Sequence, residues 1–289
     1  MTLPAVEFDR VSIVFGDNPD RALPLMDQGQ TRAEVQTKTG QILGVHDCSL
    51  SVAEGEILVL MGLSGSGKST LLRGVNALNP VVRGEVRVNN GDKMVSVTKA
   101  DPETLRKLRL SRIAMVFQQF GLLPWRTVRD NVGLGLELAG QSPEQRRAKV
   151  DQQLALVNLS QWADRKVGEL SGGMQQRVGL ARAFATDAPI LLMDEPFSAL
   201  DPLIRTKLQD ELLALQARVR KTILFVTHDL DEALKLGNQT TVLEGGRIVQ
   251  TGTPEDIVLR PANAYVGEFV QHMNPLSVLN GRMVMRPWT

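Results

Sequence analysis

The sequence predicts an α/β fold with a mainly parallel sheet that helices cover on both faces. Two observations support this prediction. Short apolar runs rich in β-forming residues recur along the chain, and stretches of helical composition separate them. One of these runs, residues 56–61, ends at a glycine-rich lysine loop, and helix-forming residues follow that loop. The order strand, loop, helix is typical of proteins that bind phosphate at a helix N-terminus.

The individual elements are predicted in chain order. Residues 6–15 alternate between apolar and polar side chains, as a strand with one buried face does. Residues 17–41 are polar and contain Gly and Pro, so we expect an inserted surface segment with a short helix near residues 31–38. A second strand region begins at Ile42. Further strands are expected at residues 113–117, 190–193 and 222–227, and helices at residues 69–78, 203–219 and 230–236.

A helical subdomain is expected at about residues 120–185, because the strand signal disappears there. Within it, residues 142–156 suit a helix, since Pro143 fits the first turn and the apolar residues after it share one face. Beyond residue 250, Gly and Pro residues separate short helices. We therefore predict one domain over residues 1–250, including the helical subdomain and the insertion, and a short tail over residues 251–289.

Composition limits the classes of partner. With 33 basic and 32 acidic residues, the chain of 289 residues offers no basic surface for nucleic acid. The single cysteine, Cys48, cannot form a disulfide within the chain and is expected to be a small buried residue. No apolar run approaches the roughly 18 residues that cross a bilayer, and the N-terminus does not resemble a secretory signal. We expect a cytoplasmic protein that binds no nucleic acid.

The glycine-rich loop fits the pattern G-x-x-x-x-G-K-[ST], in which glycines let backbone N–H groups approach phosphates. Lys68 would neutralise β- and γ-phosphate charge, and the Ser69 hydroxyl would bind Mg²⁺. A plain glycine-rich turn is the alternative, but the flanking strand and helix favour a nucleotide site. The loop and the residue after it are Gly62, Leu63, Ser64, Gly65, Ser66, Gly67, Lys68, Ser69 and Thr70.

Two carboxylates, Asp194 and Glu195, follow the apolar strand at residues 190–193. The carboxyl ends of strands face the ligand crevice in open α/β sheets. Asp194 is therefore suited to hold Mg²⁺, and Glu195 is suited to act as the general base that polarises the attacking water. A solvated acidic turn is the alternative for these two residues taken alone.

A second glycine motif reads Leu170-Ser171-Gly172-Gly173-Met174-Gln175-Gln176-Arg177. Ser171 is a good N-cap, and the two glycines after it leave the start of the following helix accessible to an anion. Taken without its neighbours, the Ser-Gly-Gly triplet is equally consistent with a linker between two helices.

This octet resembles the signature motif of the ATP-binding-cassette family, and the resemblance extends from Val6 to about Val270. The resemblance implies an ATPase with a P-loop NTPase (RecA-like) core, an antiparallel β subdomain and an inserted α-helical subdomain. The other family motifs follow in the usual order: Walker A at residues 62–69, Gln118 in the Q-loop, Walker B at residues 190–195, the D-loop at residues 198–201 and His228 as the switch histidine.

The resemblance also implies how ATP and Mg²⁺ are bound. Two copies would pack head to tail, so that each ATP lies between the Walker A loop of one chain and Ser171 and Gly173 of the other. Phe15 stands where the family carries an aromatic that stacks on adenine, and ordinary core packing is the alternative for it. The implied catalytic residues are Glu195, His228 and Gln118; the implied nucleotide contacts are Phe15, residues 62–70, Ser171, Gly172, Gly173 and Asp201; the implied Mg²⁺ ligands are Ser69, Gln118 and Asp194.

The inserted segment resembles the N-terminal region of quaternary-amine import ATPases, at Phe15-Gly16-Asp17, Arg21-Ala22-Leu23 and Thr39-Gly40. The choline importers are the nearest branch, and glycine betaine, proline betaine or carnitine import is the alternative. Many glycine betaine relatives continue into paired cystathionine-β-synthase-type modules, whereas this sequence stops at Thr289, which favours choline.

The same resemblance implies a location and partners. We expect a homodimer on the cytoplasmic face of the bacterial inner membrane, working with integral-membrane permease subunits and an extracytoplasmic quaternary-amine-binding protein. Trp125 would either meet the permease or pack inside the helical subdomain. A soluble cassette ATPase that acts on DNA or ribosomes is the alternative of another class, but the chain lacks its usual coiled coil or metal-binding cysteines. An inactive scaffold is opposed by the joint presence of the catalytic residues.

Overall fold

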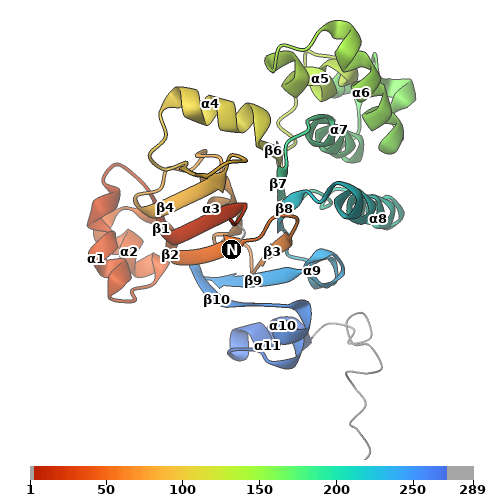
Figure 1. The fold of residues 1–289 in the computed structure, drawn as a ribbon. Helices are drawn as coiled ribbons and strands as arrows, with labels where there is room; N and C mark the ends of the chain where they lie inside the picture. Colours follow the sequence, from red (N-terminus) through yellow and green to blue (C-terminus); the bar gives the residue numbers. More distant parts are fainter. Residues whose placement is uncertain (1–2, 272–289) are drawn as a thin grey trace, which may run out of the picture. The chain divides into compact units, whose positions relative to one another are not determined.

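Strands and helices alternate along the chain, and they divide between two compact units (Figure 1). The computed structural model describes residues 3–271. The first unit comprises Met1–Lys99 and Phe225–Thr289, and the second unit comprises Ala100–Leu224. Strand β8 (Thr222–Val226) begins in the second unit and ends in the first.

An antiparallel sheet of four strands, in the order β2-β1-β4-β5, forms one part of the first unit. Val6 of β1 is paired with Val52 on one side and with Val88 on the other, so β1 is a central strand. Val6 and Phe8 are buried, as the alternation in the sequence predicts. The four strands are β1 (Val6–Phe15), β2 (Ile42–Val52), β4 (Arg83–Asn89) and β5 (Met94–Ser96).

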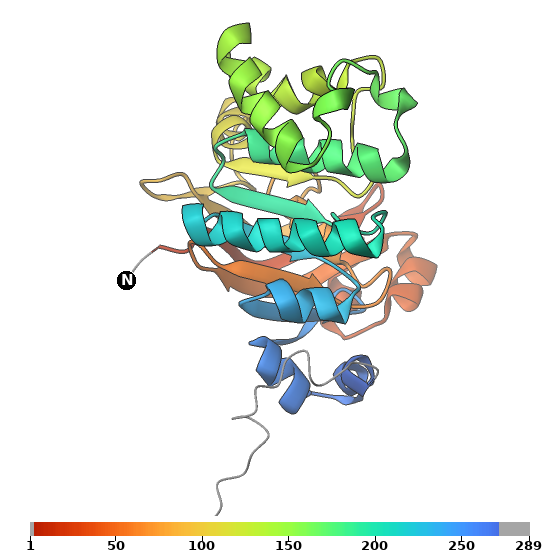
Figure 2. The same ribbon diagram turned by 90° about the vertical axis from the view of Figure 1, so that its right-hand side faces the viewer.

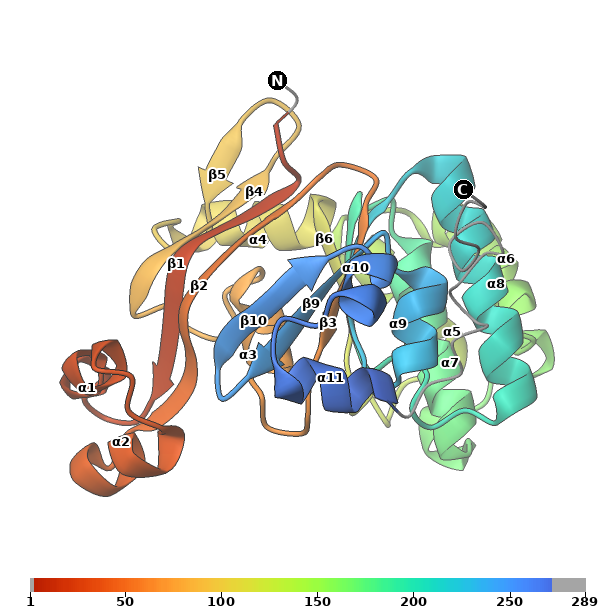
Figure 3. The same ribbon diagram turned by 90° about the horizontal axis from the view of Figure 1, so that it is seen from below.

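The inserted segment between β1 and β2 forms more structure than the sequence indicates. The expected helix is α2, which begins after a capping box of Thr31 and Glu34 and ends at Gly40 in the left-handed region. Sequence patterns do not predict α1, because it is five residues long and buries only Met26. Met26 and Val35 join a small apolar cluster with residues of β1 and β2. The segment contains η1 (Pro19–Arg21), α1 (Leu23–Asp27) and α2 (Arg32–Thr39), which lie beside the ends of β1 and β2 (Figure 3).

An ion-pair cluster attaches α1 to the antiparallel sheet. The Asp27 carboxylate accepts hydrogen bonds from both terminal nitrogens of Arg83, at 2.9 and 2.8 Å, and lies 3.0 Å from His46 Nε2. These contacts, with Arg83 as the larger cause, hold the pKa of Asp27 well below its usual value. Asp27 is half exposed and Arg83 is partly exposed, so solvent screens their ion pair and its effect on the free energy of unfolding is small.

We expect Asp27→Asn to lower the melting temperature at neutral pH, by an amount equivalent to less than about 1 kcal/mol. A carboxyl group whose pKa is lowered by folding contributes stability above its unfolded pKa of about 3.9 and loses that contribution as the pH falls. The difference in melting temperature between parent and variant should therefore stay constant from about pH 7 to about pH 5 and shrink as the pH is lowered further, to about 3. Thermal unfolding across this range measures it, and a difference that does not change with pH would contradict the assignment.

The first unit also contains the strands that carry the phosphate loop. β3 pairs in parallel with β9, β9 pairs antiparallel with β10, and all five residues of β3 are buried, as a strand covered on both faces requires. The Thr227 N–H, directly after β8, donates to the Leu60 carbonyl at 3.2 Å. The elements are β3 (Ile57–Met61), α3 (Lys68–Gly74), α9 (Leu230–Leu236), β9 (Gln239–Glu244), β10 (Arg247–Gly252), α10 (Pro254–Leu259) and α11 (Ala264–Gln271).

The helix expected over residues 69–78 is shorter in the structure. α3 ends at Gly74, and Ala77 has a φ of 54°, which is incompatible with a continuing α-helix. The chain then turns toward β4, so the expected last turn of the helix is wrong.

The second unit contains two parallel strands, β6 and β7, whose residues are all buried. Between residues 120 and 185 this unit forms helices and no β-strand, as the sequence predicts. Helices α5, α6 and α7 pack against one another (Figure 2), and α6 buries Val150 and Leu154 on its inner face. The elements are α4 (Pro102–Ser111), β6 (Ile113–Val116), α5 (Val128–Leu138), α6 (Pro143–Leu156), η2 (Ser160–Trp162), η3 (Val167–Glu169), α7 (Gly172–Ala185), β7 (Ile190–Asp194) and α8 (Pro202–Val219).

The structure confirms the predicted fold class, with parallel strands, an antiparallel sheet and an inserted group of helices. Cys48 is buried as expected, and burial raises the pKa of its thiol to about 12, so the thiol is unreactive in the folded chain. Over residues 3–271, no helix combines the length and the apolar character needed to cross a membrane.

Candidate nucleotide site

The phosphate loop follows β3 and leads into α3, so the start of that helix faces the loop. Lys68 is almost fully buried, with 5% of its surface exposed. Its ammonium group donates to the carbonyl oxygens of Gly62 and Leu63, at 2.8 and 2.9 Å. These two hydrogen bonds wrap the loop around the ammonium group of Lys68. Ser69 and Thr70 lie in the first turn of α3.

Two loop glycines have conformations and surroundings that exclude a side chain. Gly62 has a φ of 140°, and a Cβ atom there would lie 2.2 Å from the Leu243 carbonyl oxygen of β9. Gly67 has a φ of 106°, and its Cβ would lie 2.8 Å from the Gly44 carbonyl oxygen of β2. The loop backbone therefore packs directly against two strands, which fixes its path.

The side chains of Phe15 and Thr70 both lie next to Gly44. A Cβ atom placed on Gly44 would be 3.0 Å from Phe15 Cε2 and 2.9 Å from Thr70 Cγ2. Phe15 is partly exposed at the end of β1 rather than enclosed in the core. The Phe15 side chain is thus partly exposed next to the first turn after the phosphate loop, and its stacking on adenine stays a prediction.

His228 is exposed on the turn between β8 and α9. Buried polar contacts hold this turn: Thr227 Oγ1 donates to Glu232 Oε2 at 2.7 Å and accepts from the Asp229 N–H at 2.9 Å. Asp229 in turn caps α9 by accepting from the Glu232 N–H. The imidazole is therefore presented from a rigid turn in the same unit as the phosphate loop.

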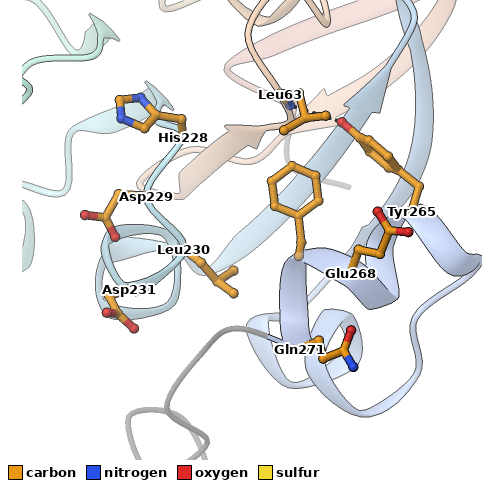
Figure 4. Close-up of a pocket in the computed structure, with 9 residues that line it drawn as sticks. Leu63, His228, Asp229, Leu230, Asp231, Tyr265, Glu268 and Gln271 are labelled. Atoms are coloured by element: carbon orange, nitrogen blue, oxygen red, sulfur yellow. Dashed lines mark hydrogen bonds between the residues drawn. The ribbon is translucent and has the colours of Figure 1, made fainter.

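A cavity of about 690 Å³ lies beside the phosphate loop in the first unit. Figure 4 shows that Leu63 lies on one side, the turn of His228 on another and helix α11 on a third. The residues that line it are Leu63, His228, Asp229, Leu230, Asp231, Tyr265, Glu268, Phe269 and Gln271.

Two further residues, Arg32 and Tyr265, lie near the phosphate loop although no sequence motif predicts them there. Arg32, at the start of α2, donates through Nη2 to the Gly44 carbonyl, and its Nη1 would be 3.8 Å from a Cβ on Gly65. Arg32 Nε is buried without a hydrogen-bond partner among the described residues, and burial lowers the pKa of its guanidinium group, so the insertion brings a partly buried positive charge to the loop. Tyr265 of α11 bonds to Leu63. No local pattern marks either residue, although Tyr265 is the only tyrosine of the chain.

The second unit brings Gln118, Asp194 and Glu195 together at the ends of β6 and β7. Asp194 is fully buried, and Glu195 is partly exposed with a φ of 48°. Gln118 Nε2 donates to Glu195 Oε2 at 3.3 Å. A non-glycine residue in the left-handed region is uncommon and is often found at functional sites.

Helix α7 links the signature motif to the segment that follows β7. Ser171 caps α7 by accepting from the Met174 N–H at 3.4 Å, and Ser171 and Gly172 are exposed. Further along α7, the buried Gln176 donates to the Glu195 carbonyl at 3.2 Å and accepts from the Ala199 N–H at 3.0 Å. Gln176 belongs to the octet, but no sequence pattern predicts this bridge.

Two other contacts complete the second unit. Arg182 of α7 donates to the carbonyl oxygens of Phe120 and Gly121, at 2.8 and 2.6 Å, and so fixes the segment after Gln118. The Asp201 carboxylate accepts from the Ile204 N–H at 3.0 Å and caps α8.

The predicted site residues thus form two groups. Phe15, the phosphate loop and His228 belong to the first unit, and the remaining residues belong to the second. The hydroxyl of Ser69, the amide of Gln118 and the carboxylate of Asp194 are hard oxygen donors, which is the donor set that Mg²⁺ prefers.

Comparison with known proteins agrees with this geometry. Residues 45–198 match the family model described as "ABC transporter". The chain is 47% identical to the glycine betaine/proline betaine transport system ATP-binding protein ProV of Escherichia coli (strain K12), over 97% of the chain and 69% of that protein. It is 41% identical to the choline transport ATP-binding protein OpuBA of Bacillus subtilis (strain 168), over 81% of the chain and 60% of that protein.

A solved structure is also similar. The chain superimposes with a TM-score of 0.74 and 32% identity on a dimeric post-hydrolysis state of the ATP-binding cassette MJ0796 bound to ADP and Pi. The similarity covers 86% of this chain and 98% of that one.

Proposed function

Because this chain belongs to the ATP-binding-cassette (ABC) transporter family and is an ABC-type ATPase, we propose that it powers the uptake of a quaternary amine through separate membrane subunits. The observation that carries this proposal is the 47% identity over 97% of the chain to an ATPase named for glycine betaine and proline betaine transport.

ATP hydrolysis follows from the roles proposed for the chain's own residues. In this proposal Lys68 turns from the carbonyls of Gly62 and Leu63 to the β- and γ-phosphates and neutralises their charge. Glu195 accepts a proton from the water that attacks the γ-phosphorus, and Gln118 and His228 position that water. Ser69, Gln118 and Asp194 would hold Mg²⁺, which would neutralise phosphate charge.

We propose that two copies of the chain form each complete ATP site. The exposed start of α7, with Ser171 and Gly172, offers a helix N-terminus and free backbone N–H groups to a phosphate. A γ-phosphate bound to one chain's loop is the natural ligand for this surface on a second chain. The dimeric form of the similar cassette supports this assignment.

The exposed surface of the second unit supports docking to a permease. Trp125 is 69% exposed, so packing inside the helical subdomain does not explain it. Trp125 follows the Phe120–Gly121 segment, which Arg182 holds in place. This segment connects Trp125 to Gln118 along the chain. We place the ATPase dimer on the cytoplasmic face of the bacterial inner membrane, with permease subunits and an extracytoplasmic amine-binding protein as partners.

Choline and glycine betaine are the two candidate cargoes. The sequence motifs favour the choline importers, whereas the identity is higher to the glycine betaine/proline betaine ATPase than to the choline ATPase, at 47% and 41%. The ATPase does not contain the solute site, so both solutes belong in the test, with carnitine as a third.

The test is ATP-driven uptake into vesicles that contain the chain, its permease and its binding protein. We expect uptake of at least one of choline, glycine betaine and carnitine with ATP inside, and none in vesicles that contain Lys68→Ala. Active ATP hydrolysis without uptake of any of the three would remove the quaternary-amine proposal and leave the ATPase intact.

A further inference from the structure

The tail helix α11 reaches the phosphate loop through the side chain of Tyr265. The Tyr265 hydroxyl accepts a hydrogen bond from the Leu63 N–H at 3.0 Å, and it donates to the Leu243 carbonyl oxygen at 3.2 Å. The first of these bonds is the dashed line in Figure 4. Leu243 belongs to β9, so the phenol joins the loop, the sheet and the tail at one point.

The Tyr265 hydroxyl binds at the place where the phosphate loop leaves the sheet. The Leu243 carbonyl oxygen lies so close to Gly62 that it would be 2.2 Å from a Cβ there. Gly62 and Leu63 are therefore held from two sides: Lys68 binds their carbonyls, and Tyr265 binds the Leu63 N–H. If Lys68 turns to a bound phosphate, the Tyr265 contact remains.

The surroundings of Tyr265 keep its ring in place. Phe269, one helical turn later in α11, packs edge-on against it with ring centroids 5.1 Å apart and an interplanar angle of 78°. Asn263 accepts from the Val266 N–H at the start of α11, and Gln250 of β10 accepts from the Ala262 N–H at 2.8 Å. Burial raises the pKa of the phenol, so it stays neutral and keeps its donor proton near neutral pH.

We propose that Tyr265 is a positioning residue of the ATP site, whose hydroxyl holds the phosphate loop in its nucleotide-binding conformation. This inference rests on the proposed nucleotide site and adds to it a connection between α11 and the loop. Without the hydroxyl, the Leu63 N–H bonds to water and the loop samples other conformations. The apparent affinity for ATP then falls in proportion to the fraction of molecules whose loop remains in the nucleotide-binding conformation.

The test compares two variants of the full chain by ATP binding and steady-state hydrolysis. Tyr265→Phe removes only the hydroxyl and is expected to raise the Kd and KM for ATP about fivefold, while kcat stays within about twofold. Phe269→Leu loosens the packing of the Tyr265 ring and keeps the hydroxyl, so we expect it to raise the Kd less than Tyr265→Phe does. Equal effects of the two variants, or no effect of Tyr265→Phe, would overturn the proposal.

A spectroscopic measurement separates positioning from general stability. Because the chain has a single tyrosine, 3-fluorotyrosine labels Tyr265 alone. Because the phenol stays bonded to the loop that receives the phosphates, the charge of bound ATP should shift the ¹⁹F resonance of the parent, and the resonance of Lys68→Ala should remain unchanged when ATP is added. A parent resonance that does not respond to bound ATP overturns this inference alone, whereas a parent chain that binds no ATP overturns the proposed nucleotide site and this inference together.

Discussion

Replacing Glu195 by glutamine is expected to reduce steady ATP turnover by about 10²–10⁴-fold while ATP binding is retained. Glutamine has nearly the same size and can occupy the same position beside Gln118, but it cannot accept the proton of the attacking water. The phosphate loop belongs to the other unit and is unchanged, so the nucleotide still binds. Phosphate release and equilibrium binding of labelled ATP measure the two quantities.

Glu144→Gln is the matched control for this variant, because Glu144 is an exposed glutamate in the first turn of α6 in the same unit. It removes the same charge without touching the proposed site, and its turnover should equal that of the parent. Parental turnover in Glu195→Gln would show that another group accepts the proton.

Ser171→Asp is expected to lower hydrolysis about 100-fold or more while a single chain binds ATP as before. Aspartate caps a helix as well as serine does, so α7 should begin at the same residue. The new carboxylate, however, places a negative charge where we propose that the partner's γ-phosphate binds, and repulsion between charges a few ångströms apart is worth several kcal/mol in a partly buried site. Hydrolysis and ATP binding are measured as for Glu195.

Ser142→Asp provides the control, since Ser142 caps α6 with the same geometry and has no proposed contact with ATP. The Ser142 variant should hydrolyse ATP at the parental rate. If Ser171→Asp also retained full hydrolysis, the start of α7 would not contact nucleotide and the shared site would have to be abandoned.

The parts of the fold that follow from local patterns could be predicted from the sequence. Strands such as β3 and β7 are short apolar runs buried on both faces, and α6 has a Pro at its start and one apolar face. The phosphate loop is recognisable because its glycines are needed where the backbone meets neighbouring strands, as at Gly62 and Gly67. The roles given to the individual site residues remain predictions.

The contacts that connect these parts could not be predicted, because they join segments far apart in the sequence. Gln176 bridges the segments around Glu195 and Ala199, Arg32 reaches the loop from an insertion, and Tyr265 reaches it from the tail. Each is a single polar side chain without periodicity or a motif of its own. Their partners are backbone groups, which carry no sequence signal.

The molecular mass of the Glu195→Gln variant in solution, measured with and without Mg·ATP, tests the central claim that two copies of the chain complete each ATP site. Because this variant should bind ATP without hydrolysing it, we expect light scattering to show a mass of twice the 31.7 kDa chain with ATP and of one chain without nucleotide. Adding Ser171→Asp to the variant should restore the mass of one chain. A mass that stays at one chain at saturating ATP, or a dimer that Ser171→Asp does not weaken, would contradict the shared site.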